Sequence, residues 1–193
     1  MQAMGPYGEE RSEVAESAEA LAVLAAGGDD GALSTLVHRY SRPLYSFIRR
    51  YHPDGGDCDD LFQETWMGVM SGIGRFDPTR RFSTWLFQIA LNKCRDLARR
   101  GRTRTKFQAE QMDQNKEMIG ESVEKGIESA AVTEAIEALP TLQKEVLLLR
   151  YYNDLSEAEV SEILGCPRGT VKSRLHNALK AVRQTLTLGE AGS

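Results

Sequence analysis

The chain has 193 residues, of which 41% are hydrophobic and 27% are charged. This suits one compact domain or two small ones and is short for a multi-step enzyme. No stretch approaches the roughly 18 consecutive apolar residues of a membrane-spanning helix, and residues 1–30 lack the basic start and apolar run of a signal peptide. With only three scattered cysteines (Cys58, Cys94 and Cys166), we expect a cytoplasmic protein without disulfides or membrane insertion.

The charge is distributed unevenly along the chain, although the net charge is only −4. Residues 1–30 hold seven acidic residues and one arginine, and residues 107–138 hold eight acidic residues and two lysines. By contrast, residues 95–106 hold six basic residues and one aspartate, and residues 168–183 hold five basic residues and no acid. Two basic patches separated by acidic stretches indicate two surfaces that meet polyanions.

The hydrophobic pattern of the first half is helical, without the alternation typical of strands. Apolar residues recur at helical spacing over 31–51. A second helix is expected from Asp57, whose side chain would cap its first turn, and a third helix over 82–100. We predict that these helices form one domain over 25–100, preceded by a disordered acidic extension over 1–24.

The second half is predicted to hold a linker and a smaller helical domain. Apolar residues become sparse over 101–132, which is typical of a flexible linker. The domain is expected over 133–187, where a helix follows Pro140 and buries Leu142 among other residues. The predicted fold class is therefore all-α, with two small helical domains joined by a flexible linker.

Residues 155–182 have the layout of a helix-turn-helix unit. Ser156 and Glu159 match a capping box, Gly165 ends this short helix, and Pro167 begins the next. The last helix then turns a basic face outward that would fit the major groove of duplex DNA. The alternative, a solvated basic helix in an ordinary bundle, is disfavoured by this combination. The predicted duplex-binding residues are Arg168, Thr170, Lys172, Ser173, Arg174, His176 and Lys180.

The segment 75–100 mixes aromatic and basic side chains. Aromatic rings stack on unpaired bases, cations follow the phosphate backbone, and amides can read an exposed base edge. The alternative is that Phe82, Trp85 and Phe87 form the core of a small domain, which is the better interpretation of Phe87 and of part of Trp85. The predicted residues that bind single-stranded DNA are Phe76, Arg80, Arg81, Phe82, Ser83, Thr84, Trp85, Gln88, Asn92, Arg95 and Arg99.

Four acidic residues lie in the first two turns of the second helix: Asp57, Asp59, Asp60 and Glu64. The helix dipole favours acids at this position, so we interpret them as a surface for a basic protein partner rather than as a Mg²⁺ site. The cysteines and histidines lack metal-ligand spacing. We expect no catalytic residue, no metal site and no cofactor.

These motifs occur in the order of a known family. Three segments resemble region 2 of the extracytoplasmic-function (ECF) sigma factors: DDLFQETW (59–66), FDP (76–78) and FSTWLFQIALN (82–92). Three others resemble region 4 of that family: Leu139-Pro140, Leu155-Ser156 and GCPRGTVKSRL (165–175). The similarity covers most of residues 30–185, and the two regions in this order are far more specific than either motif alone.

The resemblance implies a non-catalytic subunit of bacterial RNA polymerase that directs transcription initiation. By analogy, region 4 reads the −35 promoter element as duplex, and region 2 captures the −10 element as a melted strand, with residues 76–84 and Asn92 around an extruded base. The second helix would dock on the clamp helices of the β′ subunit, and region 4 on the β flap. The expected core polymerase-binding residues are Asp60, Leu61, Gln63 and Glu64.

The resemblance further implies control by an anti-sigma factor, which would hold the protein in the cytoplasm or at the membrane, and a regulon for stress, envelope or metal responses. The linker would thread toward the polymerase active-site cleft. Gly169 leaves one exposed position of the recognition helix without a side chain. We expect weak promoter binding by the chain alone and tight binding by the holoenzyme, because polymerase would hold two weak sites at the right separation.

Two other functions are less consistent with the sequence. A stand-alone helix-turn-helix regulator would need an effector or dimerisation domain, and residues 25–100 show no ligand-pocket or phosphoacceptor pattern. A nucleic-acid enzyme that uses the carboxylates of 57–64 would need further metal ligands.

Overall fold

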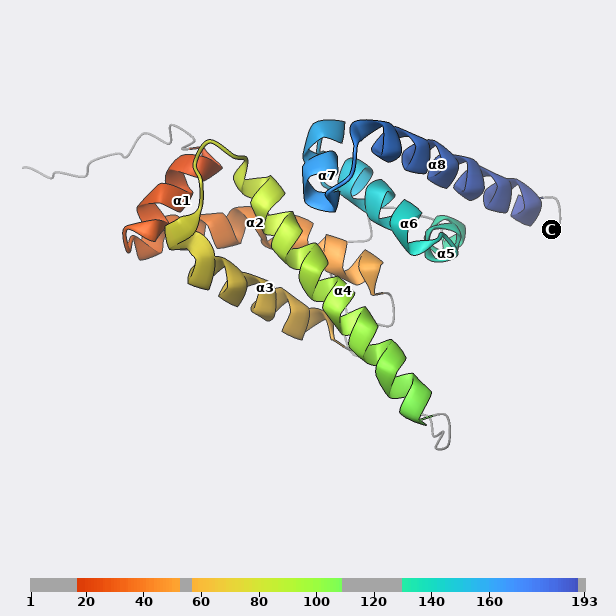
Figure 1. Ribbon diagram of the computed structural model, residues 1–193, viewed down its shortest axis with the longest axis horizontal. Helices are drawn as coiled ribbons and strands as arrows, with labels where there is room; N and C mark the ends of the chain where they lie inside the picture. Colours follow the sequence, from red (N-terminus) through yellow and green to blue (C-terminus); the bar gives the residue numbers. More distant parts are fainter. Residues whose placement is uncertain (1–16, 53–56, 109–129, 191–193) are drawn as a thin grey trace, which may run out of the picture.

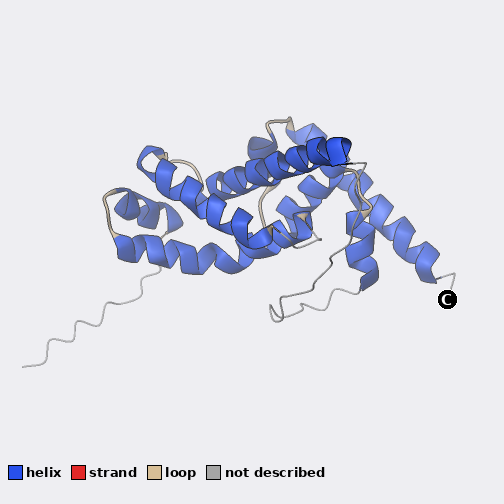
Figure 2. Cartoon of the chain, turned by 90° about the horizontal axis from the view of Figure 1, so that it is seen from below, coloured by secondary structure: helices blue, strands red, loops and turns tan. Residues whose placement is uncertain are grey.

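The computed structural model describes residues 17–52, 57–108 and 130–190, and all regular structure in these ranges is helical (Figures 1 and 2). This confirms the all-α prediction. The elements are α1 (Ala18–Ala26), α2 (Asp30–Tyr51), α3 (Cys58–Gly72), the 3₁₀ turn η1 (Ile73–Arg75), α4 (Phe82–Gln108), α5 (Ala130–Glu137), α6 (Thr141–Leu147), the π-helical turn η2 (Leu148–Tyr152), α7 (Glu157–Leu164) and α8 (Arg168–Glu190). We call α1–α4 the first module and α5–α8 the second module.

The first module begins earlier than the sequence analysis expected. Residues 18–24 were assigned to a disordered extension, but they form most of helix α1. The Ser17 hydroxyl caps this helix by accepting a hydrogen bond from the Ala20 amide at 3.1 Å. Leu21 is only 3% exposed, because α1 packs against α2. Residues 1–16 of the expected extension lie outside the described residues.

Helices α3 and α4 differ from the prediction at their ends. Asp57 occupies the N-cap position of α3, but its side chain makes no capping hydrogen bond. Helix α4 runs on to Gln108 rather than stopping near Arg100. Gly101 does not end α4, since a single glycine lowers helix stability by only about 1 kcal/mol and no proline follows it. In Figure 1 the last turns of α4 project past the end of α3.

Two glycines allow α3 and α4 to pack closely. A Cβ atom on Gly68 would lie 3.1 Å from Cγ2 of Ile89, and one on Gly72 would lie 3.1 Å from Cζ2 of Trp85. The glycines are one helical turn apart and therefore lie on the same face of α3. This glycine pair was not predicted from the sequence, although the two glycines allow the helix that carries the acidic residues to approach α4 closely.

The second module also begins earlier than predicted, and one of its residues is not where we expected it. Residues 130–132, assigned to the linker, form the first turn of α5. Leu142, predicted to be buried, is 48% exposed. It lies in the first turn of α6, and the buried stripe of that helix begins one turn later, at Glu145 and Val146. The remainder of the predicted linker, 109–129, lies outside the described residues.

The helix-turn-helix prediction is confirmed in its local details. The Ser156 hydroxyl accepts from the Glu159 amide at 3.3 Å, and the Ser156 amide donates to the Glu159 carboxylate at 2.8 Å, which completes the capping box. Gly165 ends α7 in the left-handed conformation, with φ of 61°, which suits glycine. Val171 of α8 is fully buried. This geometry turns the polar face of α8 outward.

The two modules pack against each other. Helix α2 contacts η2, and α4 contacts α7. Buried apolar residues of both modules belong to one connected core. The Arg50 guanidinium also lies over the Tyr152 ring, 4.1 Å from its centroid. The sequence indicated two modules on a tether, and their mutual packing became visible only in the structure.

Candidate nucleic-acid interface

The recognition helix α8 presents most of its predicted residues to solvent. Thr170 and Arg174 are the half-buried members of the set, and an Nη1 atom of Arg174 lies 3.7 Å from the Cys166 sulfur. The Lys172 ammonium lies 3.7 Å from the Glu157 carboxylate, but Lys172 remains 67% exposed, so this ion pair is weak. The exposed members are Arg168, Lys172, Ser173, His176 and Lys180.

Gly169 has open space where a side chain would project. A Cβ atom there would meet no other atom within 4 Å, and the residue lies in the first turn of α8. Because alanine restricts the unfolded chain and favours helix, we expect Gly169→Ala to raise the free energy of unfolding by up to about 1 kcal/mol. Urea denaturation of both proteins measures this difference. A loss of stability would show that this position is sterically constrained.

The aromatic residues at the start of α4 form a cluster, and Phe82 is its centre. Phe82 is fully buried, with ring centroids 5.3 Å from Tyr40, 5.7 Å from Phe76 and 5.9 Å from Trp85. This corrects the prediction that the Phe82 ring offers a face to an unpaired base, because core packing covers it. Phe76 and Trp85 are half-buried, and Phe87 is a core residue, as its alternative interpretation proposed.

The turn that leads into α4 is held by local hydrogen bonds. The Asp77 carboxylate accepts from the Thr79 amide at 2.9 Å and from its hydroxyl at 2.7 Å, and these bonds lower the pKa of Asp77. The Glu19 carboxylate of α1 accepts from the Phe82 amide at 3.0 Å. Burial raises the pKa of Glu19, but its hydrogen bonds and Arg81 lower it more, so the group stays anionic at the α4 N-terminus.

The basic residues beside this turn contact acidic residues of the second module. The Arg80 Nε donates to the Glu162 carboxylate at 2.6 Å. The Arg81 guanidinium lies 3.7 Å from Glu159, and the Thr84 hydroxyl donates to the same carboxylate at 3.4 Å. Thr84 is fully buried. These predicted DNA-binding groups are therefore engaged within the protein.

Arg95 makes the most buried of these contacts. Its guanidinium donates two hydrogen bonds to the Glu145 carboxylate, at 2.8 and 2.7 Å, and the Tyr51 hydroxyl donates a third at 3.0 Å. Glu145 is only 1% exposed. The hydrogen bonds to Glu145 raise the pKa of Arg95, while burial and the Glu145 charge raise the pKa of Tyr51. The Arg95–Glu145 ion pair, with the Tyr51 hydroxyl as a third donor, therefore links the two modules.

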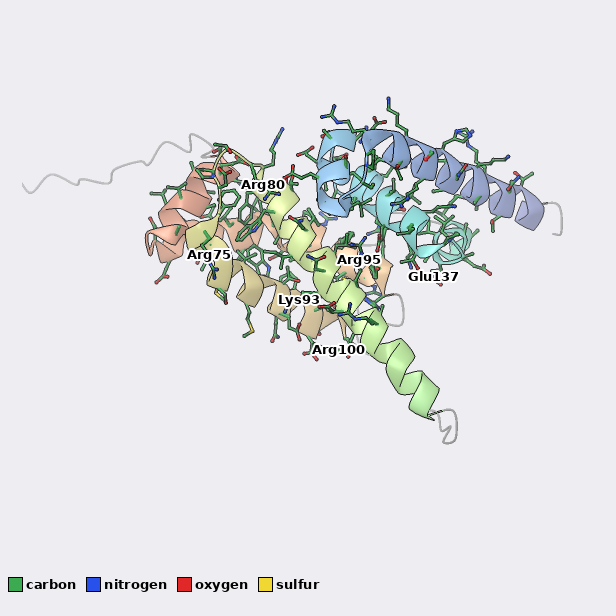
Figure 3. All side chains as sticks on the ribbon, in the orientation of Figure 1. Arg75, Arg80, Lys93, Arg95, Arg100 and Glu137 are labelled. Carbon is green, nitrogen blue, oxygen red and sulfur yellow. The ribbon has the colours of Figure 1, made fainter. Side chains whose placement is uncertain are left out.

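Figure 3 shows how the sides of α4 differ. Arg95 lies on the side turned toward the second module, whereas Lys93 lies toward α3, where its ammonium is 3.3 Å from the Glu64 carboxylate. Asn92 and Arg99 are exposed, while Ser83 and Gln88 are half-buried. The predicted single-strand face is therefore divided into an accessible part and a part covered by the second module.

The acidic face of α3 presents three of its four predicted polymerase-binding residues. Asp60, Gln63 and Glu64 are exposed, but Leu61 is 4% exposed and belongs to the core, which corrects its assignment to a contact surface. A cleft between α3 and α4 is lined by Asp57, Asp60, Leu61, Glu64, Lys93, Asp96, Leu97 and Arg100. Its mixed charges suit a polar protein partner.

Within the described ranges, no group of three or more His, Cys, Asp or Glu residues is arranged to hold a metal ion. Cys58 and Cys94 are buried, and burial raises the pKa of Cys94 to about 12 and also raises that of Cys58. Both thiols are therefore unreactive. Of the helices described, none has both the length and the apolar character required to cross a bilayer.

The acidic partners Glu145, Glu159 and Glu162 were not predicted from the sequence. A signal existed for Glu145, which directly precedes the apolar run 146–149 and is spaced to face the core with it. An acid at such a position favours a charged, hydrogen-bonding partner. Glu159 was recognised only as a capping residue, and its second contact, across the modules, has no local sequence pattern.

Comparison with known families matches both modules. The model of Sigma-70 region 2 matches residues 36–105, and the model of Sigma-70, region 4 matches residues 129–182. The ECF RNA polymerase sigma factor SigW of Bacillus subtilis (strain 168) is 32% identical over 170 residues, covering 82% of this chain and 91% of SigW. The ECF RNA polymerase sigma factor SigC of Mycobacterium tuberculosis (strain CDC 1551 / Oshkosh) is 33% identical over 168 residues, covering 86% and 90% of the two chains.

Two solved structures have a similar arrangement. CnrH in complex with the cytosolic domain of CnrY has a TM-score of 0.66 and 26% identity, covering 88% of this chain and 97% of that one. The sigma factor RpoE in complex with the anti-sigma factor NepR from Bartonella quintana has a TM-score of 0.70 and 20% identity, covering 80% and 96%. At 20% identity, the similarity to RpoE shows a similar fold and nothing further.

Proposed function

Because the chain belongs to the ECF sigma factors, the non-catalytic RNA polymerase subunits that direct transcription initiation at promoters, we propose a specific role for each of its exposed faces. The observation that carries the assignment is that regions 2 and 4 occur together, in the family order, on one chain. A stand-alone regulator that reads DNA through its helix-turn-helix would not require region 2.

Helix α8 is the proposed reader of the −35 element. Arg168 lies at its first residue, where a side chain in the major groove approaches the base edges, and it can donate two hydrogen bonds to a guanine. Lys172 and Lys180 are better suited to phosphates, because contact with a phosphate depends on charge more than on direction. Ser173 and His176 complete the exposed face.

Helix α4, from its start to about its middle, is the proposed −10 site. Trp85 lies half-buried in its first turn, and Asn92 and Arg99 are exposed further along the helix, so that a ring, an amide and a cation, groups that suit an unpaired strand, lie along it. Arg80 and Arg95 would also be accessible to DNA in a conformation in which the second module no longer packs against α4. Phe82 supports the site from the core by packing under Phe76 and Trp85.

The acidic face of α3 is the proposed contact with core polymerase. Asp60, Gln63 and Glu64 project from consecutive turns and would meet basic residues of the β′ clamp helices, while the second module would meet the β flap. We further propose that an anti-sigma factor covers these faces. Such a partner would hold the protein inactive in the cytoplasm, or at the membrane, until a stress, envelope or metal signal releases it.

Pull-down with core RNA polymerase and run-off transcription test these roles together. We expect Asp60→Ala/Gln63→Ala to lower the amount of chain retained by polymerase several-fold, because two contacts of the docking face are lost. Arg168→Ala should be retained normally and should lower promoter-dependent transcripts about tenfold or more, since a bidentate base contact contributes about 1–3 kcal/mol. A chain that is never retained by polymerase would instead support the stand-alone regulator.

A further inference from the structure

The middle of the exposed face of α8 begins with a glycine. A line of exposed residues, at spacings of four, three and four positions, runs along this face: Gly169, Ser173, His176 and Lys180. The fully buried Ala178 lies on the opposite side of the helix. In a helix-turn-helix unit, the N-terminal residues of the recognition helix approach the base edges. The first residue of this line, which lies at that end, therefore has no side chain.

The fold itself does not require a glycine at position 169. Gly68 and Gly72 are needed because a Cβ atom on either would meet α4 at 3.1 Å, and Gly165 is suited to its φ of 61°. A Cβ atom on Gly169 would meet no described atom within 4 Å, and the φ of Gly169 is not positive. Glycine is also one of the weakest helix formers. A residue that weakens its helix without a visible gain inside the chain indicates a requirement set by a ligand.

The surroundings of Gly169 leave its backbone open to such a ligand. Gly169 and Arg168 are both exposed. One turn further along, the Ser173 hydroxyl donates to the Thr170 carbonyl at 3.0 Å, so this side chain is turned back onto the helix. The space above Gly169 is therefore bordered by Arg168, the residue that we propose to hydrogen-bond a guanine.

We propose that Gly169 sets how closely α8 approaches the bases of the −35 duplex, because the space at this residue admits the edge of a base pair against the helix backbone. This rests on the proposed function, since it uses the proposed role of α8. A ligand can come closer to the backbone at glycine than at any other residue. A methyl group there would hold the helix away from the bases. The hydrogen bonds from Arg168, which need donor–acceptor distances of about 2.7–3.2 Å, would then lengthen and weaken.

The position of Gly169 favours base edges over phosphates as the group that enters this space. When a helix lies in the major groove, the middle of its exposed face points to the base edges, whereas its flanks face the phosphates of the two strands. Gly169 lies on the middle line, and the base edges differ with sequence while the phosphates do not. Filling the space should therefore weaken binding to preferred sequences and leave binding to arbitrary duplex nearly unchanged.

The test uses the holoenzyme assembled from the full chain and core RNA polymerase. The unaltered holoenzyme first selects sequences from a library of random 60-base-pair duplexes, which gives a selected pool and an unselected pool. The variants are Gly169→Ala and Gly169→Leu, since alanine and leucine are both good helix formers. The matched control is Gly74→Ala, which adds the same methyl group at an exposed glycine of η1 whose Cβ position also has no atom within 4 Å.

The readout is filter binding of the two labelled pools. We expect Gly169→Ala to weaken binding to the selected pool about fivefold or more, the usual effect of one added methyl group in a closely packed contact. Gly169→Leu should weaken it at least as much. Both variants should bind the unselected pool within about twofold of the unaltered holoenzyme, because that binding depends on phosphate contacts. Retention by polymerase should be unchanged and the stability of Gly169→Ala should not fall, which separates a lost DNA contact from misfolding.

Arg168→Ala separates failure of this inference from failure of the proposed function. If Arg168→Ala weakens binding to the selected pool and Gly169→Ala does not, the role of Gly169 is refuted while the proposed −35 role of α8 stands. If neither variant weakens it, the −35 role of α8 is refuted as well. An equal loss on both pools, or an equal loss in Gly74→Ala, would also refute the inference, because the effect would then not depend on base edges at Gly169.

Discussion

Phe82→Ala is expected to lower the free energy of unfolding of the first module by about 3–5 kcal/mol, because it removes a fully buried ring and leaves a cavity. The ring contacts Tyr40, Phe76 and Trp85, which come from α2, the turn before α4 and α4 itself. Loss of the ring would therefore loosen several elements at once. Urea denaturation followed by tryptophan fluorescence measures the change, since Trp85 lies in the cluster.

Phe82→Leu separates the two roles that the sequence left open for this residue. Leucine keeps most of the buried volume, so its cost should stay below about 1.5 kcal/mol. If Phe82 is a core residue, the leucine variant should retain single-strand binding and promoter use. A selective loss of single-strand binding in a variant of near-normal stability would restore the discarded prediction that this ring stacks on a base.

Arg95→Ala is expected to destabilise the packed arrangement of the two modules by about 3 kcal/mol, because it leaves the Glu145 carboxylate buried with only the Tyr51 hydroxyl. This value lies at the lower end of the range for breaking a buried ion pair, because the Arg95 side chain is 37% exposed. Separation of the modules would also let water reach Glu145. Hydrogen exchange of amides in α2 and α6 measures it, through faster exchange at both sides of the interface.

Two further variants define the cause of the Arg95 effect. Arg99→Ala is the matched control, since Arg99 is 78% exposed and pairs with Asp96 on the same helix, and it should change exchange at the interface little. Arg95→Met/Glu145→Met should recover most of the lost protection, because apolar side chains can replace a buried ion pair without a stranded charge. Faster exchange in this double variant than in Arg95→Ala would contradict the explanation.

Local features of the fold followed from short sequence patterns. The capping box of Ser156 and Glu159, the left-handed Gly165 and the outward basic face of α8 depend on residues within one or two helical turns. The same holds for the helical periodicity over 31–51. These predictions were correct because the forces involved, capping and burial of a stripe, act between neighbours in the sequence.

Predictions about which side of a helix is accessible were less accurate. Phe82 and Leu61 were assigned to contact surfaces and are core residues, whereas Leu142 was assigned to the core and is exposed. For each of these residues, the local sequence pattern is compatible with a buried side chain and with an exposed one. The choice depends on which other helix packs there, and that helix is distant in the sequence.

The amino-acid sequence by itself determined the helical class, the helix-turn-helix and the family, because these are encoded by periodicity, caps and motifs over short spans. Only the tertiary structure decided that Glu145 meets Arg95 and that Glu162 meets Arg80, residues that lie 50 and 82 positions apart. Acidic and basic residues are common along the chain, and nothing local selects one partner for another. Shape complementarity of the packed helices makes that selection, and it thereby decides which proposed DNA face is covered.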